Sequence, residues 1–241
     1  MAPPLELYLL TFNCAQSLVD SHSFARNLFA ALPEGARLPD IVVLSLQEIA
    51  PLAYSFLGEA YFKPYLDRVT ASVQLAAEHH DGANEAYREV AHVFLGMTGI
   101  VLFARQNMAS RVDVKGGAST GVGLWGMGNK GAAAVRVGYS WEDGGISKET
   151  ELTFVAAHLA PMESGLKRRN LDWEHIVRNL AFVPATANGQ MPYKDQGADG
   201  TDDHEEDTRP LLPGQCRHRP ETTRSPRLAC SVVAAVPTRR G

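Results

Sequence analysis

Polar residues follow two apolar segments of the sequence, at the points where each segment ends. Residues 5–12 lead to Asn13, and residues 41–46 lead to Gln47 and Glu48. In layered α/β folds, side chains just beyond strand ends converge on the ligand crevice. Mg²⁺ prefers one or two carboxylates, with water and phosphate oxygens as its other ligands. The spacing alone fits a cation site, but it fits turn-starting or helix-capping residues at least as well.

A glycine-rich segment, residues 116–131 (GGASTGVGLWGMGNKG), ends in Asn129, Lys130 and Gly131. Glycine lets the backbone approach an anion closely, and the lysine supplies positive charge. The segment is not a Walker loop, because it lacks the glycine spacing and the following Ser or Thr. A phosphate cradle and a flexible connection with a solvated lysine both remain open.

Two further positions could serve an anionic ligand. His158 follows the apolar residues 152–157 and could donate to a phosphoryl oxygen. Residues 167–170 (Lys-Arg-Arg-Asn) begin a predicted helix, where the helix dipole favours acidic side chains. This conflict between charge and dipole is expected if the charges of this run serve an anionic ligand. Viewed singly, a structural histidine and a solvated basic face are the commoner interpretations.

Apolar patterning predicts the elements that position these groups. Continuous apolar runs predict buried strands, and spacings of three and four predict amphipathic helices. Strands are expected at 5–12, 41–46, 132–139 and 151–157, and helices at 22–32 and 166–181, with helical stretches in 52–80 broken at Gly58 and Pro64. These elements predict a layered α/β fold with a mixed sheet.

Two hairpins are predicted. One joins 93–104 to 108–114 around Gln106-Asn107, and the other joins 132–139 to 151–157. The second turn contains Asp143-Gly144-Gly145, a composition that tolerates positive φ.

The pattern divides the chain at about residue 184. Residues 5–183 are periodic, whereas 184–241 are first acidic and then rich in Arg and Pro. Such a tail cannot bury enough apolar surface to offset its ordering entropy, so we expect it to be disordered.

Composition limits the location and the partners. The net charge of −4 argues against dedicated nucleic-acid binding, and three scattered cysteines suit a reducing compartment. The sequence starts without a signal-peptide pattern and has no apolar run of membrane-spanning length. We therefore expect a soluble, cytoplasmic protein.

Five stretches, in this order, resemble the inositol-polyphosphate 5-phosphatases, especially the fungal phosphoinositide 5-phosphatases. They are TFNCAQ (11–16), DIVVLSLQEI (40–49), MTGIVLFAR (97–105), GMGNKGAAAVRV (126–137) and FVAAHLAPMESGLKRRNLDW (154–173). The resemblance covers residues 5–183. It favours the functional interpretation of each motif over the structural one.

The resemblance implies a four-layer α/β sandwich of the exonuclease III and DNase I type, incomplete in this chain. It also implies Mg²⁺-dependent removal of the 5-phosphate from a phosphoinositide or inositol phosphate by an in-line water, with no nucleic-acid substrate and with peripheral membrane binding as one option. The matching residues are Asn13 and Glu48 for the metal, His158 for the scissile phosphate, and Asn129, Lys130, Arg168 and Asn170 for the phosphate pocket.

The sequence also departs from this family. The family continues with a Gly-Asp-Leu-Asn-Tyr-Arg segment and ends with Ser-Asp-His, and this sequence contains neither. Asp202-Asp203-His204 lies in an acidic run, and we do not take it for the missing motif. We expect the N-terminal half of the domain with an out-of-frame or intron-derived tail, exposed apolar surface on the first sheet, and little or no activity. The alternative is a non-catalytic phosphoinositide-binding or interaction module.

Overall fold

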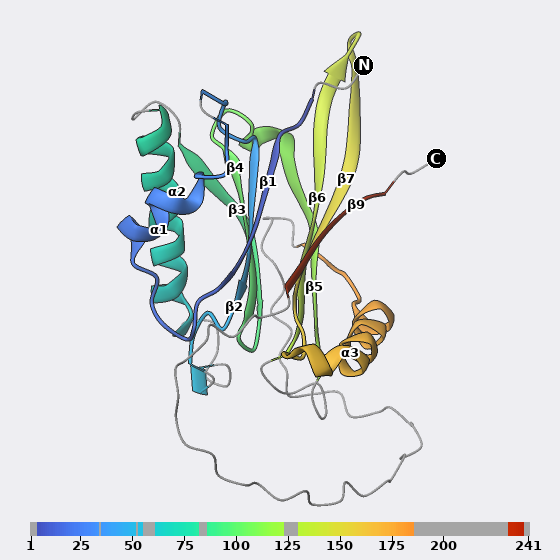
Figure 1. Ribbon diagram of the computed structural model, residues 1–241. Helices are drawn as coiled ribbons and strands as arrows, with labels where there is room; N and C mark the ends of the chain where they lie inside the picture. The colour runs from blue at the N-terminus through green and yellow to red at the C-terminus, as the bar shows by residue number, and fades with distance from the viewer. Residues whose placement is uncertain are drawn as a thin grey trace, which may run out of the picture. The chain divides into compact units, whose positions relative to one another are not determined.

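The computed structural model describes residues 4–33, 35–51, 53–54, 61–81, 86–122, 130–185 and 231–238. The chain divides into a unit of residues 1–192 and 228–241 and a second unit of residues 193–227. Every described residue belongs to the first unit. In that unit two sheets pack face to face, with helices α1 (Ser21–Leu28) and α2 (Lys63–Asp81) on one outer face and α3 (Leu166–Asn179) on the other (Figure 1).

The first sheet has the strand order β1-β2-β4-β3. Its members are β1 (Leu7–Asn13), β2 (Ile41–Gln47), β4 (Thr98–Arg105) and β3 (Tyr87–Leu95). β1 pairs parallel to β2, and the other pairs are antiparallel. All residues of β2 and β4 are buried, because these central strands are covered on both faces.

The second sheet has the order β8-β5-β6-β7-β9, and all of its pairs are antiparallel. It contains β8 (Val183–Pro184), β5 (Val112–Gly121), β6 (Gly131–Asp143), β7 (Ile146–His158) and β9 (Ser231–Thr238). β6 and β7 form a long hairpin that ends at His158, so the register of this hairpin positions a candidate site residue.

Alternation along β2 shows how the layers are held together. Val42 and Leu44 join the core beneath α1 and α2, whereas Ile41 and Val43 join the core between the two sheets. A third, smaller core contains Ile176 of α3, which packs on the outer face of the second sheet. The predicted four-layer α/β sandwich is confirmed.

A buried ion pair anchors the first sheet at the end opposite to Asn13 and Glu48. Arg105 Nη2 donates to Asp40 Oδ1 at 2.7 Å, and the Glu6 amide donates to Asp40 Oδ2 at 3.0 Å. Both members of the pair are nearly inaccessible, so removing either would leave a buried charge. Asp40 therefore links the starts of β1 and β2 to the end of β4.

The two predicted hairpins had different outcomes. The hairpin around Gly144-Gly145 is confirmed, with φ of 62° and 80° at the two glycines. The hairpin around Gln106-Asn107 is wrong, because β3 turns into β4 at Gly96, which has a φ of 56°, and β5 belongs to the other sheet. The apolar run 93–104 therefore conceals a tight turn that the glycine permits.

The helices follow the predictions with shifted bounds. α1 begins after Asp20, whose carboxylate accepts from the Ser23 amide at 2.8 Å, and it ends earlier than expected. Pro64 does not break α2 but lies in its first turn, where the missing amide hydrogen has no intrahelical partner to lose. Gly58 lies outside the described residues.

The tail differs from the prediction in one part. Residues 231–238 form β9, which pairs antiparallel with β7 from Ser231 opposite His158 to Thr238 opposite Glu151. The segment SVVAAVPT is apolar and rich in valine, so it can add to the open edge of β7 although it has no strand neighbour in sequence. Residues 186–230 and 239–241 lie outside the described part of the chain, and Asp202-Asp203-His204 lies there too.

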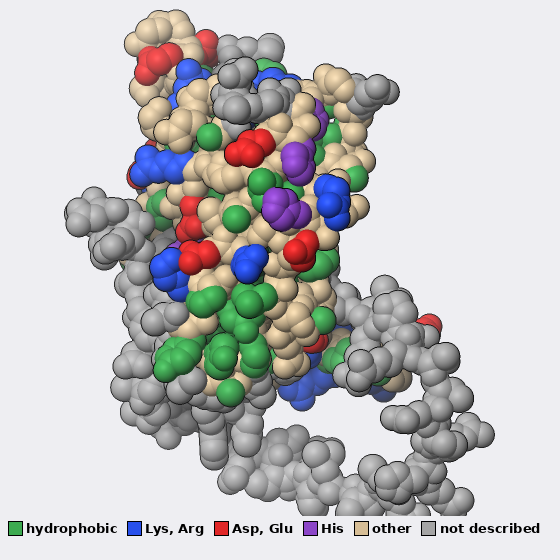
Figure 2. Space-filling view, turned by 90° about the vertical axis from the view of Figure 1, so that its left-hand side faces the viewer, with side chains coloured by type: hydrophobic (Ala, Val, Ile, Leu, Met, Phe, Trp, Pro, Cys, Tyr) green, Lys and Arg blue, Asp and Glu red, His purple; other side chains and the backbone are tan. Residues whose placement is uncertain are grey.

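Apolar side chains remain partly exposed on the edge strand β1, as expected for the first sheet. Leu7, Leu9 and Phe12 are 37%, 39% and 38% exposed. Hydrophobic side chains also gather at the lower end of the helical face, below scattered charged and histidine side chains (Figure 2). In the described residues no helix combines the length and the apolar character needed to cross a membrane.

Candidate functional site

The carboxyl ends of three strands bring the candidate residues to one edge of the sandwich. Asn13 ends β1 opposite Gln47 at the end of β2, and His158 ends β7 opposite Gly131. These strand ends and the start of α3 lie at the lower edge of the view in Figure 1. Groups from distant parts of the sequence therefore converge on one place.

Glu48 adopts a backbone conformation that is unusual for its residue type. Its φ of 49° lies in the left-handed region, directly after β2. Two hydrogen bonds hold the loop: Gln16 donates its amide to the Glu48 carbonyl at 2.7 Å, and Ile49 donates its amide to the Met97 carbonyl at 3.2 Å. Such a conformation costs about 1–3 kcal/mol and persists only where the surroundings enforce it, often at functional sites.

Glu48 and His158 face each other across the two sheets. Glu48 Oε1 lies 4.0 Å from His158 Nε2. The His158 side chain is 2% exposed, whereas that of Glu48 is 28% exposed. A carboxylate that still reaches solvent can accept a cation, and a buried imidazole beside it has a fixed orientation.

Lys130 completes this cluster from the start of β6. Its Nζ lies 2.7 Å from His158 Nε2, and since an ammonium can only donate, the imidazole nitrogen accepts. Burial lowers the pKa of Lys130, and the negative charges of Glu48 and Asp172 partly oppose that shift. The cluster thus joins a cation with a reduced proton affinity, an imidazole and a carboxylate.

The two amides beside Glu48 have different surroundings. Asn13 Oδ1 accepts from the Ala15 amide at 2.8 Å, which closes a turn at the end of β1. Gln47 is buried, and its Nε2 donates to Ser45 Oγ at 3.0 Å. Gln47 therefore supports the sheet, and Asn13 shapes the loop while keeping the second lone pair of its oxygen.

The arginines at the start of α3 donate hydrogen bonds to protein oxygens. Arg168 Nε donates to Asp172 Oδ1 at 2.8 Å, and its Nη2 donates to the Val122 carbonyl at 3.0 Å. Arg169 Nη1 donates to the Ala160 carbonyl at 3.1 Å. Protein oxygens thus accept two of the five side-chain N–H groups of Arg168, one from Nε and one from Nη2. Asn170 is exposed on α3, and Asn129 lies outside the described residues.

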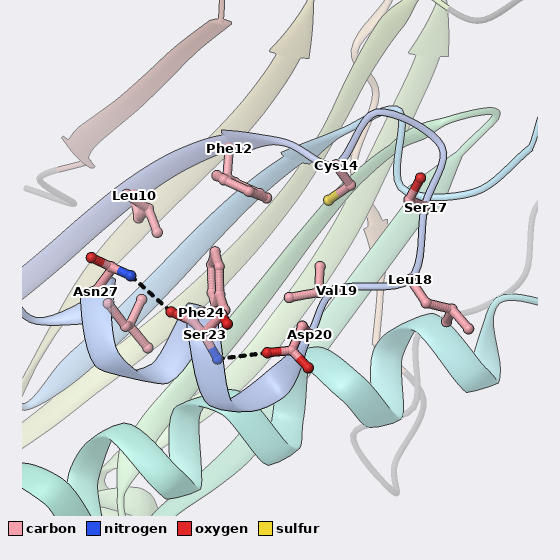
Figure 3. Close-up of a pocket in the computed structure, with 11 residues that line it drawn as sticks. Leu10, Phe12, Cys14, Ser17, Leu18, Val19, Asp20, Ser23, Phe24 and Asn27 are labelled. Carbon is pink, nitrogen blue, oxygen red and sulfur yellow. Dashed lines mark hydrogen bonds between the residues drawn. The ribbon is translucent and has the colours of Figure 1, made fainter.

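A separate cavity of about 470 Å³ lies between β1 and α1 (Figure 3). The side chains that point into it include Leu10, Phe12, Cys14 and Phe24. At its polar rim, the Ser23 amide donates to Asp20 Oδ1 and Asn27 Nδ2 donates to the Ser23 carbonyl. Burial, aided by the charge of Glu48, raises the pKa of Cys14 to about 12, so its thiol stays protonated. This cavity is apolar and contains none of the predicted site residues.

Sequence reasoning missed Asp172 and the Val122 carbonyl. Asp172 is 3% exposed, and it lies one helical turn from both Arg168 and the buried Ile176. That spacing places an acid on the inward face of a helix, which is a signal available in the sequence. The Val122 carbonyl has no such signal, because the backbone supplies it.

The donor set fits a hard cation held by few protein ligands. Glu48 offers a partly exposed carboxylate, and Asn13 offers an amide oxygen at the neighbouring strand end. Mg²⁺ is often held by one or two carboxylates together with water and substrate phosphates. Within the described ranges, no group of three or more His, Cys, Asp or Glu forms a metal site.

Comparison with known proteins identifies the family. The model of the endonuclease/exonuclease/phosphatase family 2 matches residues 10–208. Polyphosphatidylinositol phosphatase INP53 of Saccharomyces cerevisiae is 31% identical over 159 residues, which are 65% of this chain and 13% of the yeast protein.

A solved structure shares the fold. It is the inositol polyphosphate 5-phosphatase domain of SPsynaptojanin, in complex with inositol (1,4)-bisphosphate and a calcium ion. The match has a TM-score of 0.57 and 23% identity and covers 74% of this chain and 47% of that chain. The chain thus spans less than half of the solved domain. It belongs to the endonuclease/exonuclease/phosphatase family.

Proposed function

We propose that the chain supplies the cation-binding and phosphate-binding part of an inositol-polyphosphate or phosphoinositide 5-phosphatase. In that reaction a water oxygen bonds to phosphorus, the bond from phosphorus to the ring oxygen at position 5 breaks, and the ring oxygen gains a proton. The supporting observation is that Glu48, Lys130 and His158, from three separate segments, lie within hydrogen-bond or ion-pair range at one sheet edge.

Glu48 would hold Mg²⁺, and Asn13 would organise the neighbouring loop. When bound there, the ion would polarise the phosphoryl group and neutralise its charge. The backbone of Glu48 serves this role because its left-handed conformation turns the carboxylate from the end of β2 toward His158. The calcium ion of the solved synaptojanin domain supports a divalent cation in the proposed site.

Lys130 and His158 would act on the phosphate as a pair. One Lys130 hydrogen is directed to His158 Nε2, which leaves two hydrogens for phosphoryl oxygens. As the acceptor of this hydrogen bond, His158 Nε2 holds the Lys130 ammonium in place. His158 therefore stabilises the scissile phosphate through Lys130 in the present arrangement, and donates directly only if Lys130 turns to the anion.

We infer that this polypeptide alone retains substrate binding but has little or no turnover. The sequence contains neither the Gly-Asp-Leu-Asn segment nor the Ser-Asp-His motif of the resembling family. Removing groups that act as a unit leaves only a small part of the catalysis. A non-catalytic phosphoinositide-binding module is the second candidate, and the same absence of motifs supports it.

Phosphate release and vesicle binding test the proposal together. The 241-residue chain is mixed with vesicles containing phosphatidylinositol 4,5-bisphosphate and Mg²⁺, alongside the yeast relative. We expect Mg²⁺-dependent binding, and release at least about 1,000-fold slower than by the relative. Vesicles of neutral lipid should not bind, and DNA should stay uncut.

The outcomes separate the candidates. Slow release that disappears in Glu48→Ala supports a weak enzyme, and binding with no release supports the binding module. Release at the rate of the relative, lost in Glu48→Ala, contradicts the expected low activity but not the family reaction. If the chain shows no binding and no release, both candidates are contradicted. Binding to the lipid would also agree with our proposal of a cytoplasmic location at membrane surfaces.

A further inference from the structure

Asp172 is a buried acid for which the proposed reaction has no use so far. It lies on the inward face of α3, 3% exposed, and its Oδ1 accepts from Arg168 Nε at 2.8 Å. A buried carboxylate is costly unless a cation and hydrogen bonds compensate it. The Arg168 side chain is 62% exposed, so this contact lies at the border between the core and the solvent.

Arg168 extends this contact to Val122, which follows β5. Its Nη2 donates to the Val122 carbonyl at 3.0 Å, and the Val122 amide donates to the Lys130 carbonyl at 3.2 Å. Val122 and Lys130 therefore lie side by side, directly beyond the last pair of β5 and β6, Gly121 with Gly131. A continuous path of hydrogen bonds leads from the Asp172 carboxylate to the backbone of Lys130.

The geometry also limits what Arg168 offers to an anion. A guanidinium holds a phosphate with two parallel N–H bonds from one edge. The edge formed by Nε and Nη2 is occupied by Asp172 and Val122, so only the end formed by Nη1 and Nη2 is left for another partner. Lys130, in contrast, lies beside Glu48 and His158, where an anion with its cation would bind.

We propose that Asp172 and Arg168 form a positioning pair, which fixes Val122 against the backbone of Lys130 and thereby holds Lys130 toward the phosphate. The proposal rests on the proposed function. It assigns Arg168 a role through Lys130 rather than on the phosphate itself. The negative charge of Asp172 also opposes the lowering of the pKa of Lys130 by burial.

Arg168→Lys and Asp172→Asn test this pair in the 241-residue chain. Lysine keeps the charge but cannot span Asp172 and Val122. Asp172→Asn keeps Arg168 but weakens the contact that holds it, so the two variants share only the loss of the positioning contacts. We expect both variants to bind inositol 1,4-bisphosphate about 10-fold more weakly in calorimetric titrations, as is common when supporting partners are lost. In Asp172→Asn, the loss of affinity at alkaline pH should begin at lower pH, because the ammonium of Lys130 has lost a favourable charge.

Glu174→Gln is the matched control, because it breaks the ion pair of Glu174 with Arg178 at the same spacing on the same helix. It should bind as the wild type does. Hydrogen exchange of the Val122 amide, measured without ligand, should accelerate in Arg168→Lys and Asp172→Asn but not in the control. Unchanged affinity in both variants, or unchanged Val122 exchange, overturns the positioning role. If the wild type fails to bind while Val122 exchange responds as expected, the proposed function has failed and the hydrogen-bond path has not.

Discussion

Replacing Glu48 with glycine should abolish Mg²⁺ binding while leaving the fold at least as stable as the wild type. Glu48 has a φ of 49°, which costs an ordinary L-residue about 1–2 kcal/mol and glycine almost nothing. Part of that gain is offset by the greater unfolded-state entropy of glycine. We expect a free energy of unfolding up to about 1 kcal/mol higher, measured by urea titration, and Mg²⁺ affinity lower by at least about 100-fold.

Two variants distinguish the effect of the Glu48 carboxylate from the effect of the backbone strain. Glu48→Gln keeps the backbone conformation and removes the charge, so it should lose Mg²⁺ binding without gaining stability. Gln16→Gly relieves a φ of 60° in the neighbouring loop and should leave Mg²⁺ binding unchanged. Wild-type Mg²⁺ affinity in Glu48→Gln would exclude Glu48 as the metal ligand. A marked loss of stability in Glu48→Gly would show that the side chain, not the strain, matters to the fold.

Replacing Lys130 with methionine should weaken inositol 1,4-bisphosphate binding by about 10- to 150-fold, because a charged hydrogen bond is worth about 1.5–3 kcal/mol. Lys130 Nζ lies beside His158 Nε2, within the candidate phosphate site. Lys148→Met is the control, since Lys148 pairs with Asp143 at the far end of the β6–β7 hairpin. Calorimetric titration of the three proteins checks the prediction, and equal affinities would remove Lys130 from the site.

The pH dependence follows from the pKa of Lys130, which burial lowers. Affinity for the phosphate should fall with rising pH before the ordinary lysine pKa of about 10.4 is reached. The unfolded chain holds its proton to higher pH than the folded chain, so this group makes stability rise with pH between the two pKa values. In Lys130→Met, neither the phosphate affinity nor the stability should show this dependence on pH. An unchanged fall of affinity at alkaline pH in that variant would contradict the prediction.

The layered fold could be predicted because its signals are local. The continuous apolar run of β2 indicated a strand covered on both faces, and Asp143-Gly144-Gly145 indicated the long hairpin. The turn at Gly96 was hidden, because Gly96, Thr98 and Gly99 are the only interruptions of an otherwise apolar run and include none of the charged or amide residues typical of turns. β9 was missed because its stability depends on the open edge of β7, which no pattern in its own segment reports.

The candidate site was predictable in its residue types and not in its contacts. Strand ends placed Asn13, Glu48 and His158 near one another, and the structure brings Glu48 and His158 to 4.0 Å. The left-handed backbone of Glu48 could not be inferred, since glutamate rarely adopts it. Arg168 was assigned to the phosphate pocket from the family resemblance, whereas its hydrogen bonds to Asp172 and Val122 depend on how α3 packs. The functional roles of these residues stay predictions.

The most direct test is the binding of inositol 1,4-bisphosphate and Mg²⁺ to the ¹⁵N-labelled 241-residue chain, followed by backbone chemical-shift changes. If a cation and a phosphate share the edge formed by β1, β2 and β7, the largest changes will fall on Asn13, Glu48, Lys130 and His158. Changes confined to the apolar cavity between β1 and α1, around Leu18 and Phe24, or no change at saturating ligand, would contradict the account.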